Sequence, residues 1–140
     1  MTVDKKVSPT QLKQIQKALG KVPFAKLLGL EVEEIDRGTA TLGLTVEKKL
    51  TQNHGIVHGG AIASLIDTAT AFAILSLLDP REKVTTVDLT ISYLRPVSKG
   101  RLRASAKVVR AGRRLFVVSA EVFDDGGSLL STALSTYIKV

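Results

Sequence analysis

The chain has 140 residues, of which 44% are hydrophobic and 24% charged, a composition typical of one globular domain rather than a disordered chain. It contains no cysteine, which excludes a disulfide framework, a cysteine-ligated metal site and a cysteine nucleophile. Two histidines offer little for a zinc site, so no metal is expected. The net charge of +7 raises the question of an anionic partner such as nucleic acid or a membrane. We treat residues 1–140 as a single domain, with residues 1–28 as a helical extension.

The first predicted element is a short amphipathic helix over residues 8–20. Ser8 is suited to cap its start, Pro9 to its first position, and Gly20 to the residue after its end. A second helical turn is expected over residues 23–28. The N-terminus contains no apolar core of the signal-peptide type, so we expect a cytoplasmic protein.

Much of the remaining chain alternates apolar and polar residues, which is the pattern of antiparallel strands with one buried and one wet face. In residues 86–93 the alternation assigns Val87 and Tyr93 to the buried face and Thr86 to the opposite one. A turn is expected at residues 124–127. The predicted strands cover residues 30–35, 39–46, 86–93, 101–108, 115–123 and 129–139.

Residues 59–78 are apolar on every side and contain one charged residue, Asp67. A stretch of this length could cross a membrane, but a carboxylate in mid-span is costly in lipid, and amphipathic strands of a soluble type follow. We therefore favour a helix enclosed by the sheet. The predicted fold class is α+β, with an antiparallel sheet of five or six strands around one long buried helix and a short helix before it.

Asp67 needs a partner, because burying a lone carboxylate is costly. No lysine or arginine lies within two helical turns of it, so the partner comes from elsewhere in the fold or the site is wet because something binds there. A desolvated carboxylate suits a general base or a nucleophile. The alternative is a structural aspartate bonded to backbone amides or to Thr70.

The segment directly before this helix, residues 52–60, reads QNHGIVHGG. Its paired glycines, Gly59 and Gly60, let a substrate approach the backbone closely, and free N–H groups at a helix start can stabilise an oxyanion. The side-chain amide of Gln52 or Asn53 can donate a hydrogen bond to a carbonyl oxygen. Together with a carboxylate, these groups are what the transfer of an acyl group to water requires.

The histidines of this segment are open to two interpretations. His58 can contact a substrate or hold the loop, and His54 is expected to face solvent. No serine stands in a nucleophile-elbow context such as GxSxG, so a serine–histidine–aspartate triad is not expected.

Residues 95–114, called the basic segment below, hold eight basic residues and no acidic one, so the rest of the chain carries a net charge of −1. The segment lacks the aromatic residues that stack on single-stranded bases, and no helix-turn-helix or zinc-finger pattern is present. Nucleic acid is therefore not favoured. Two interpretations remain: a solvated strand face, or a docking surface for a small polyanion such as a phosphorylated cofactor.

The string Gly55-Ile56-Val57-His58-Gly59-Gly60, followed by Asp67, closely resembles the hotdog-fold acyl-CoA thioesterases of the PaaI-like kind. Residues 23–30 resemble the lead-in of that family, residues 87–96 the strand after its helix, and residues 111–114 a turn between its later strands. The resemblance implies a hotdog fold, a long antiparallel sheet wrapped around one helix. It also implies a homodimer, often paired into a homotetramer, in which the carboxylate helix of one subunit faces the glycine loop of the other.

Carried over to this chain, the resemblance implies that Asp67 activates water or attacks the thioester carbon and that the Gly59 N–H polarises the thioester carbonyl. Thr86 matches a strand position where a hydroxyl orients water or the carboxylate. The family has Asn or Gln six residues before the motif histidine, which is Gln52 here, with Asn53 as the second choice.

The implied substrate is acyl-CoA, which is hydrolysed without a metal or a separate cofactor, and neither nucleic acid nor a membrane is an expected partner. His58 and Gly60 are assigned to substrate binding, and Arg95, Arg113 and Arg114 to the phosphates of CoA. One alternative is a non-catalytic module that binds acyl-CoA, but a regulator of that type would carry a DNA-binding domain. A hotdog hydratase is a third interpretation, and its histidine-containing dyad is missing here.

Overall fold

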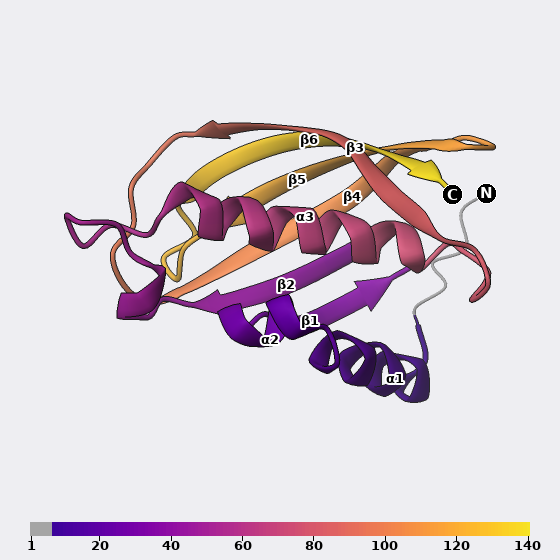
Figure 1. Cartoon of the computed structure of the whole chain (residues 1–140), viewed down its shortest axis with the longest axis horizontal. Helices are drawn as coiled ribbons and strands as arrows, with labels where there is room; N and C mark the ends of the chain where they lie inside the picture. The colour runs from indigo at the N-terminus through magenta and orange to yellow at the C-terminus, as the bar shows by residue number, and fades with distance from the viewer. Residues whose placement is uncertain (1–6) are drawn as a thin grey trace.

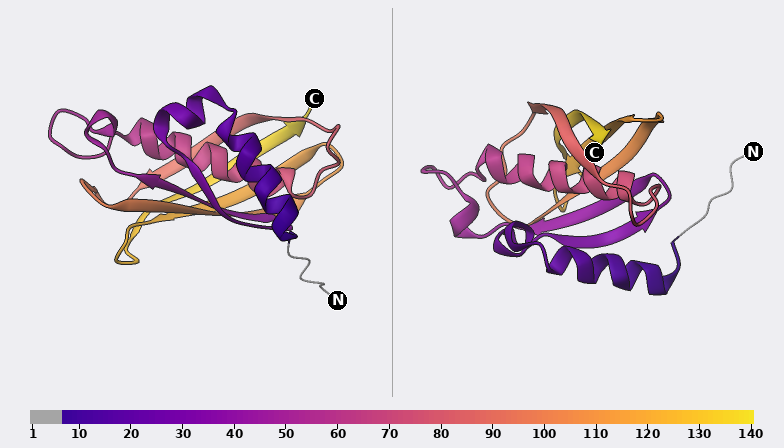
Figure 2. Two further views of the ribbon diagram at one scale, coloured as in Figure 1. Left: turned by 90° about the horizontal axis from the view of Figure 1, so that it is seen from below. Right: turned by 45° about the vertical axis from the view of Figure 1, so that its right-hand side comes forward.

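The structure of the chain is a computed structural model that describes residues 7–140. Its six strands form one antiparallel sheet in the order β1-β2-β4-β5-β6-β3. Figure 1 shows this sheet curving around the long helix α3, and the second view in Figure 2 shows α1 on the outside of the sheet, beside β1. The elements are α1 (Pro9–Gly20), α2 (Pro23–Leu28), β1 (Glu31–Asp36), β2 (Thr39–Thr45), the 3₁₀ turn η1 (Lys48–Leu50), α3 (Gly59–Leu75), β3 (Val84–Tyr93), β4 (Arg101–Ala111), β5 (Leu115–Phe123) and β6 (Leu129–Lys139).

The predicted fold class is confirmed: an antiparallel sheet wraps one long helix, as the hotdog arrangement requires, and a short helix comes before it. Every predicted strand is present, although β3 and β4 are longer than the alternation indicated. Between residues 7 and 140, no helix is long and apolar enough to cross a membrane.

Helix α1 starts where the sequence predicted. The Ser8 side chain accepts a hydrogen bond from the Gln11 backbone, and the Gln11 side chain accepts one from the Ser8 N–H, so the two form a capping box after which Pro9 opens the helix. Its end differs from the prediction by one residue. Gly20 is still helical, and Lys21 closes the helix in a right-handed conformation, so no left-handed glycine is needed there.

Helix α3 buries one face against the concave side of the sheet, mainly against β2, β4 and β5. The opposite side, which carries Ala71 and Phe72, is only half-buried, so the helix is not enclosed on every side by its own chain. It ends at Leu75 rather than at residue 78. The Ser76 hydroxyl donates to the Ala73 carbonyl and accepts from the Gly38 N–H, and this satisfies the last turn at the β1–β2 connection.

Strand β3 lies at one edge of the sheet and departs from the predicted alternation. A shift in register between Thr86 and Asp88 inserts one residue into the pairing with β6, which is a β-bulge. Thr86 therefore faces Tyr137 on the inner side, and Val87 is 55% exposed instead of buried. Tyr93, also predicted to be buried, is 51% exposed because α3 leaves the edge strand largely uncovered.

The other edge strand, β1, is covered. Helix α1 packs along it, and the Gln16 side-chain amide donates to the Val32 carbonyl over 3.1 Å. A side chain thus occupies one backbone acceptor that another strand would otherwise use. The two edges of the sheet are therefore unequal, because α1 blocks β1 while β3 stays open.

The outer face of the sheet carries an ion-pair network that joins β4 to β1 across β2. The Arg101 guanidinium lies 2.7 Å from Glu33 and the Arg103 guanidinium 2.7 Å from the other oxygen of the same carboxylate. Arg101 reaches Glu33 by crossing β2 over Gly43, where a Cβ would collide with both the guanidinium and the carboxylate. Although partial burial favours the protonated form of Glu33, hydrogen bonds from Arg103 and Arg101 hold its pKa below the usual value.

We expect Glu33→Gln to lower the free energy of unfolding by about 1 kcal/mol near neutral pH, because it removes the charge that both arginines share. Since the pKa of Glu33 is lowered in the folded state, its contribution is present above the usual glutamate pKa and is lost as the pH falls through the folded-state value. The stability difference between wild type and variant should therefore close at acid pH. Urea unfolding across that range measures it.

Glu34→Gln is the matched control, because Glu34 lies on the same strand, is exposed and forms no ion pair within the described part of the chain. It should leave the free energy of unfolding unchanged throughout. A pH-independent loss for Glu33→Gln would show that packing, and not the ion pairs, carries its effect.

Candidate active site

The carboxylate of Asp67 lies half-buried on the side of α3 that faces β3 and β6. Its Oδ1 accepts a hydrogen bond from the Thr86 hydroxyl at 2.9 Å and lies 3.0 Å from the Tyr137 hydroxyl. Its Oδ2 has no hydrogen-bond partner among residues 7–140. The partners that the sequence could not supply are therefore two hydroxyl groups, and no lysine, arginine or histidine of the described chain forms an ion pair with this carboxylate.

The structural alternative for Asp67 is met only in part. The Thr70 hydroxyl lies 3.0 Å from the Asp67 main-chain carbonyl and not against the carboxylate. No backbone N–H of the described residues donates to the carboxylate either. One oxygen of Asp67 thus stays available for chemistry, while the other is fixed.

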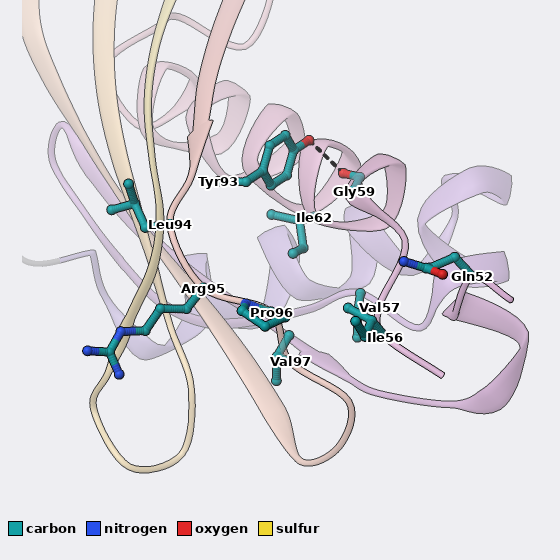
Figure 3. A pocket seen from close by; sticks show the side chains of 10 residues that line it. All are labelled: Gln52, Ile56, Val57, Gly59, Ile62, Tyr93, Leu94, Arg95, Pro96 and Val97. Atoms are coloured by element: carbon teal, nitrogen blue, oxygen red, sulfur yellow. Dashed lines mark hydrogen bonds between the residues drawn. The ribbon is translucent and has the colours of Figure 1, made fainter. Parts of the chain in front are cut away.

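Helix α3 begins at Gly59, and the N–H of this residue has no acceptor among the residues described. Tyr93 of β3 lies directly against it: the tyrosine hydroxyl donates to the Gly59 carbonyl over 2.8 Å (Figure 3). A Cβ at position 59 would come within 3.3 Å of the Tyr93 ring, so the close contact favours glycine. An N–H without an acceptor at a helix start is the kind of group that can stabilise an oxyanion.

His58 caps α3. Its Nδ1 accepts the Gly60 N–H over 2.8 Å, so one of the first N–H groups of the helix is already satisfied. Gly60 therefore does not offer its N–H to a substrate, and Gly59 is the donor that remains. The hydrogen bond from Gly60 fits the interpretation that His58 holds the loop. His54 is exposed, as expected.

A cavity of about 340 Å³ opens beside Gly59, between the loop that precedes α3 and the segment that follows β3 (Figure 3). Gln52 lines it, and Asn53 does not. The Gln52 Oε1 accepts the His54 N–H, which leaves its amide nitrogen without a partner within residues 7–140. Between the two amides left open by the sequence, the geometry favours Gln52. The remaining wall is mostly apolar, formed by Ile56, Val57, Ile62, Leu94, Pro96 and Val97.

The three arginines assigned to CoA do not come together in one chain. Arg95 lines the rim of the cavity, with its side chain extended away from Gly59 in Figure 3. Its N–H bonds to the Leu130 carbonyl at the start of β6, whereas the Arg114 carbonyl bonds to Lys139 at the end of that strand. Leu130 and Lys139 are about 30 Å apart, given the rise per residue of a β-strand. The basic segment thus spans the whole length of the sheet and does not mark one site.

Tyr137 and Tyr93 are the contacts of the site that sequence reasoning missed. Burial raises the pKa of Tyr137 well above the ordinary range and raises that of Tyr93 as well, so both hydroxyls stay protonated and can donate. The residues at the inward positions of β6 offered a sequence signal for Tyr137. In the middle of the strand these positions hold Ser131, Ala133 and Ser135, so the large polar side chain of Tyr137 stands out among small residues.

A family model of the thioesterase superfamily matches residues 54–131. The medium/long-chain acyl-CoA thioesterase YigI of Salmonella typhimurium is 30% identical to this chain over 132 residues, covering 84% of this chain and 85% of that protein. The 1,4-dihydroxy-2-naphthoyl-CoA hydrolase of Escherichia coli is 28% identical over 122 residues, covering 86% and 90%. Among solved structures, the PaaI protein of Escherichia coli, from the phenylacetic acid degradation operon, superposes with a TM-score of 0.84 at 26% identity over 91% of each chain.

We expect His58→Ala to lower the free energy of unfolding by about 1 kcal/mol, because the Gly60 N–H loses its acceptor at the helix start. His58→Asn should recover most of that stability, since asparagine is among the best capping residues. Chemical denaturation of the three proteins measures both effects. Equal stability of wild type and His58→Ala would show that the hydrogen bond does not act as a cap.

Proposed function

This chain belongs to the thioesterase superfamily and is a thioester hydrolase, and on that premise we propose that it cleaves acyl-CoA into a carboxylic acid and free CoA. The observation that carries the proposal is the Asp67 carboxylate, held through Oδ1 and open at Oδ2. A positioned carboxylate supplies a base or nucleophile, and the unpaired Gly59 N–H supplies the oxyanion donor. The proposed reaction uses no metal ion and no separate cofactor.

Two routes balance with these groups. In the first, Asp67 takes a proton from water while the water oxygen bonds to the thioester carbon. The Gly59 N–H donates to the oxyanion that forms, the C–S bond then breaks, and the CoA thiolate takes up the proton. In the second, the carboxylate itself bonds to the carbon, CoA leaves as the thiolate, and water hydrolyses the resulting anhydride.

One chain does not hold both groups at one carbonyl. Gly59 and Asp67 are eight residues apart on α3, which places them about 12 Å apart along the helix. A thioester carbon that contacts Asp67 is therefore out of reach of the Gly59 N–H of the same chain. We propose that the active site takes Gly59 from one protomer and Asp67 from the other, in a homodimer.

The open edge of the sheet supports this arrangement. Strand β3 has an unblocked edge, with Val87 and Tyr93 exposed beside the cavity and the carboxylate, whereas α1 covers the opposite edge. In the proposed dimer two copies of β3 run antiparallel about a twofold axis, so that the Gly59 end of one α3 faces the middle of the other. Each dimer then has two active sites.

The same symmetry supports the assignment of three arginines to CoA. Antiparallel pairing brings the end of β3 that carries Arg95 beside the start of the partner strand, where the β4–β5 turn with Arg113 and Arg114 lies. We propose that arginines from two protomers contact the CoA phosphates through charge-assisted hydrogen bonds. Acyl-CoA is then the small polyanion for which the basic segment is suited.

The acyl group is proposed to be bulky and apolar. The walls of the cavity beside Gly59 are mostly aliphatic, and polar groups are confined to Gln52, Tyr93, the backbone of Gly59 and, at the rim, Arg95. Two relatives are named for medium- or long-chain acyl-CoA and for a naphthoyl-CoA. Both acyl groups are compatible with an apolar wall.

We expect Asp67→Asn to lower kcat for acyl-CoA hydrolysis by at least about a hundredfold, because the amide neither takes a proton nor attacks the thioester carbon. Release of free thiol from short, long, branched and aromatic acyl-CoAs measures this effect and the substrate preference together. Asp88→Asn is the control, since Asp88 is an exposed carboxylate on β3 that accepts a hydrogen bond from the Thr136 N–H. Equal rates for wild type and Asp67→Asn would refute the catalytic assignment.

Gly59→Pro tests the role of the Gly59 N–H, because proline has no backbone N–H. Proline is favoured at the first helical position, and His58 already has the extended conformation that precedes a proline (φ −64°, ψ 134°), so the helix start should persist while the N–H is lost. We expect a loss of about a hundredfold in kcat. Gly59→Ala keeps the N–H and adds the same Cβ beside Tyr93, and it should retain most of the activity.

Co-expression of Asp67→Asn with Gly59→Pro tests the shared site. If each site combines one residue from each protomer, a mixed dimer has one intact site, so random mixing restores about a quarter of wild-type activity from two inactive variants. Differently tagged chains allow the mixed dimer to be isolated. No activity in that mixed dimer would show that both groups act within one chain.

A further inference from the structure

Tyr137 lies on β6, on the inner side of the sheet, and is 2% exposed. Its hydroxyl makes three contacts with α3: 3.0 Å to Asp67 Oδ1, 2.7 Å to the Asp67 carbonyl oxygen and 2.8 Å to the Thr70 hydroxyl. One buried phenol thus contacts both the side chain and the backbone of the same residue. Such a contact fixes Asp67 relative to β6 more closely than a bond to the side chain alone.

The second donor to Oδ1 comes from a less rigid position. Thr86 lies on the edge strand β3 and is exposed. Its side chain faces inward because of the β-bulge beside it. Tyr137 instead belongs to a strand paired on both sides, with β5 and with β3. Its ring is packed in the core, so its hydroxyl has little freedom to move away from Asp67.

We propose that Tyr137 is a positioning residue for the hydrolytic reaction: it holds Oδ1 of Asp67 so that Oδ2 is the oxygen that meets water or the thioester carbon. This inference rests on the function proposed above. Thr86 donates to Oδ1, and the Tyr137 hydroxyl shares its single proton between Oδ1 and the Asp67 carbonyl, so together they restrain the carboxylate from rotating and the same oxygen is presented at every turnover. Tyr137 itself does not touch the substrate.

The groups that lie next to Asp67 are hydroxyls. Those of Thr86 on β3 and Tyr137 on β6 contact the carboxylate, and that of Thr70 on α3 contacts the main-chain carbonyl. The described residues provide no cation in contact with the carboxylate. Without the Tyr137 hydroxyl, Thr86 is the contact to the carboxylate that remains within residues 7–140.

Tyr137→Phe is the direct test, because phenylalanine keeps the buried ring and removes only the hydroxyl. We expect kcat to fall by roughly ten- to a hundredfold with little change in KM. Ser135→Ala is the matched control. It removes another fully buried hydroxyl from the same face of β6, one that donates to the Asp88 carbonyl and not to Asp67.

Asp67→Asn, measured in parallel, separates this inference from the proposed function. If Asp67→Asn is inactive while Tyr137→Phe keeps the kcat of the wild type, the role of Tyr137 is refuted and the catalytic assignment stands. If Asp67→Asn is fully active, the catalytic assignment itself fails.

A double variant gives a second readout. Tyr137→Phe should cause no further loss in the Asp67→Asn background, because a residue that acts through Asp67 has nothing left to position. The same fold loss in both backgrounds would show that Tyr137 acts independently of the carboxylate, through the fold in general, and would overturn the proposal.

Discussion

The close approach of α3 to the sheet is the constraint on which the rest of the molecule depends. The helix presents alanines to the sheet, and the strands below it present small residues in return; the buried ones are Ala61, Ala69, Ala73, Ala104, Ala106 and Ala120. Leucine, isoleucine and valine side chains fill the rest of this core, and a hydroxyl on β6 still reaches the backbone of Asp67. Larger residues at these positions would fill space at the expense of that contact.

The fold could be predicted from the sequence because its signals are local. Capping residues, a period of two and one long apolar stretch each act over a few neighbouring residues. Asp67 and Gly59 could also be singled out, the first as a lone charge in an apolar helix and the second as a helix start. Tyr137 could not, since it follows Asp67 by seventy residues and only strand order decides that β6 passes beneath this part of the helix.

The net charge of the chain does not show where its basic residues lie in the fold. Alternation along β4 directs its basic residues to the outer face, where Arg101 and Arg103 are shared with the carboxylates of β1. Their positive charge stabilises the sheet and is not free for a ligand. The ends of the segment are separated by the length of the sheet, so this run of basic residues does not form a single surface within one chain.

The β-bulge in β3 has a consequence for how such a site can be copied or lost. Regular pairing would put Val87 opposite Tyr137, and the extra residue puts Thr86 there instead, so an irregularity of the backbone decides whether a methyl or a hydroxyl group meets the carboxylate. Regular pairing with the residues in their present order would leave the carboxylate without this donor. A designer who transfers the side chains to another scaffold must therefore also transfer the irregular backbone.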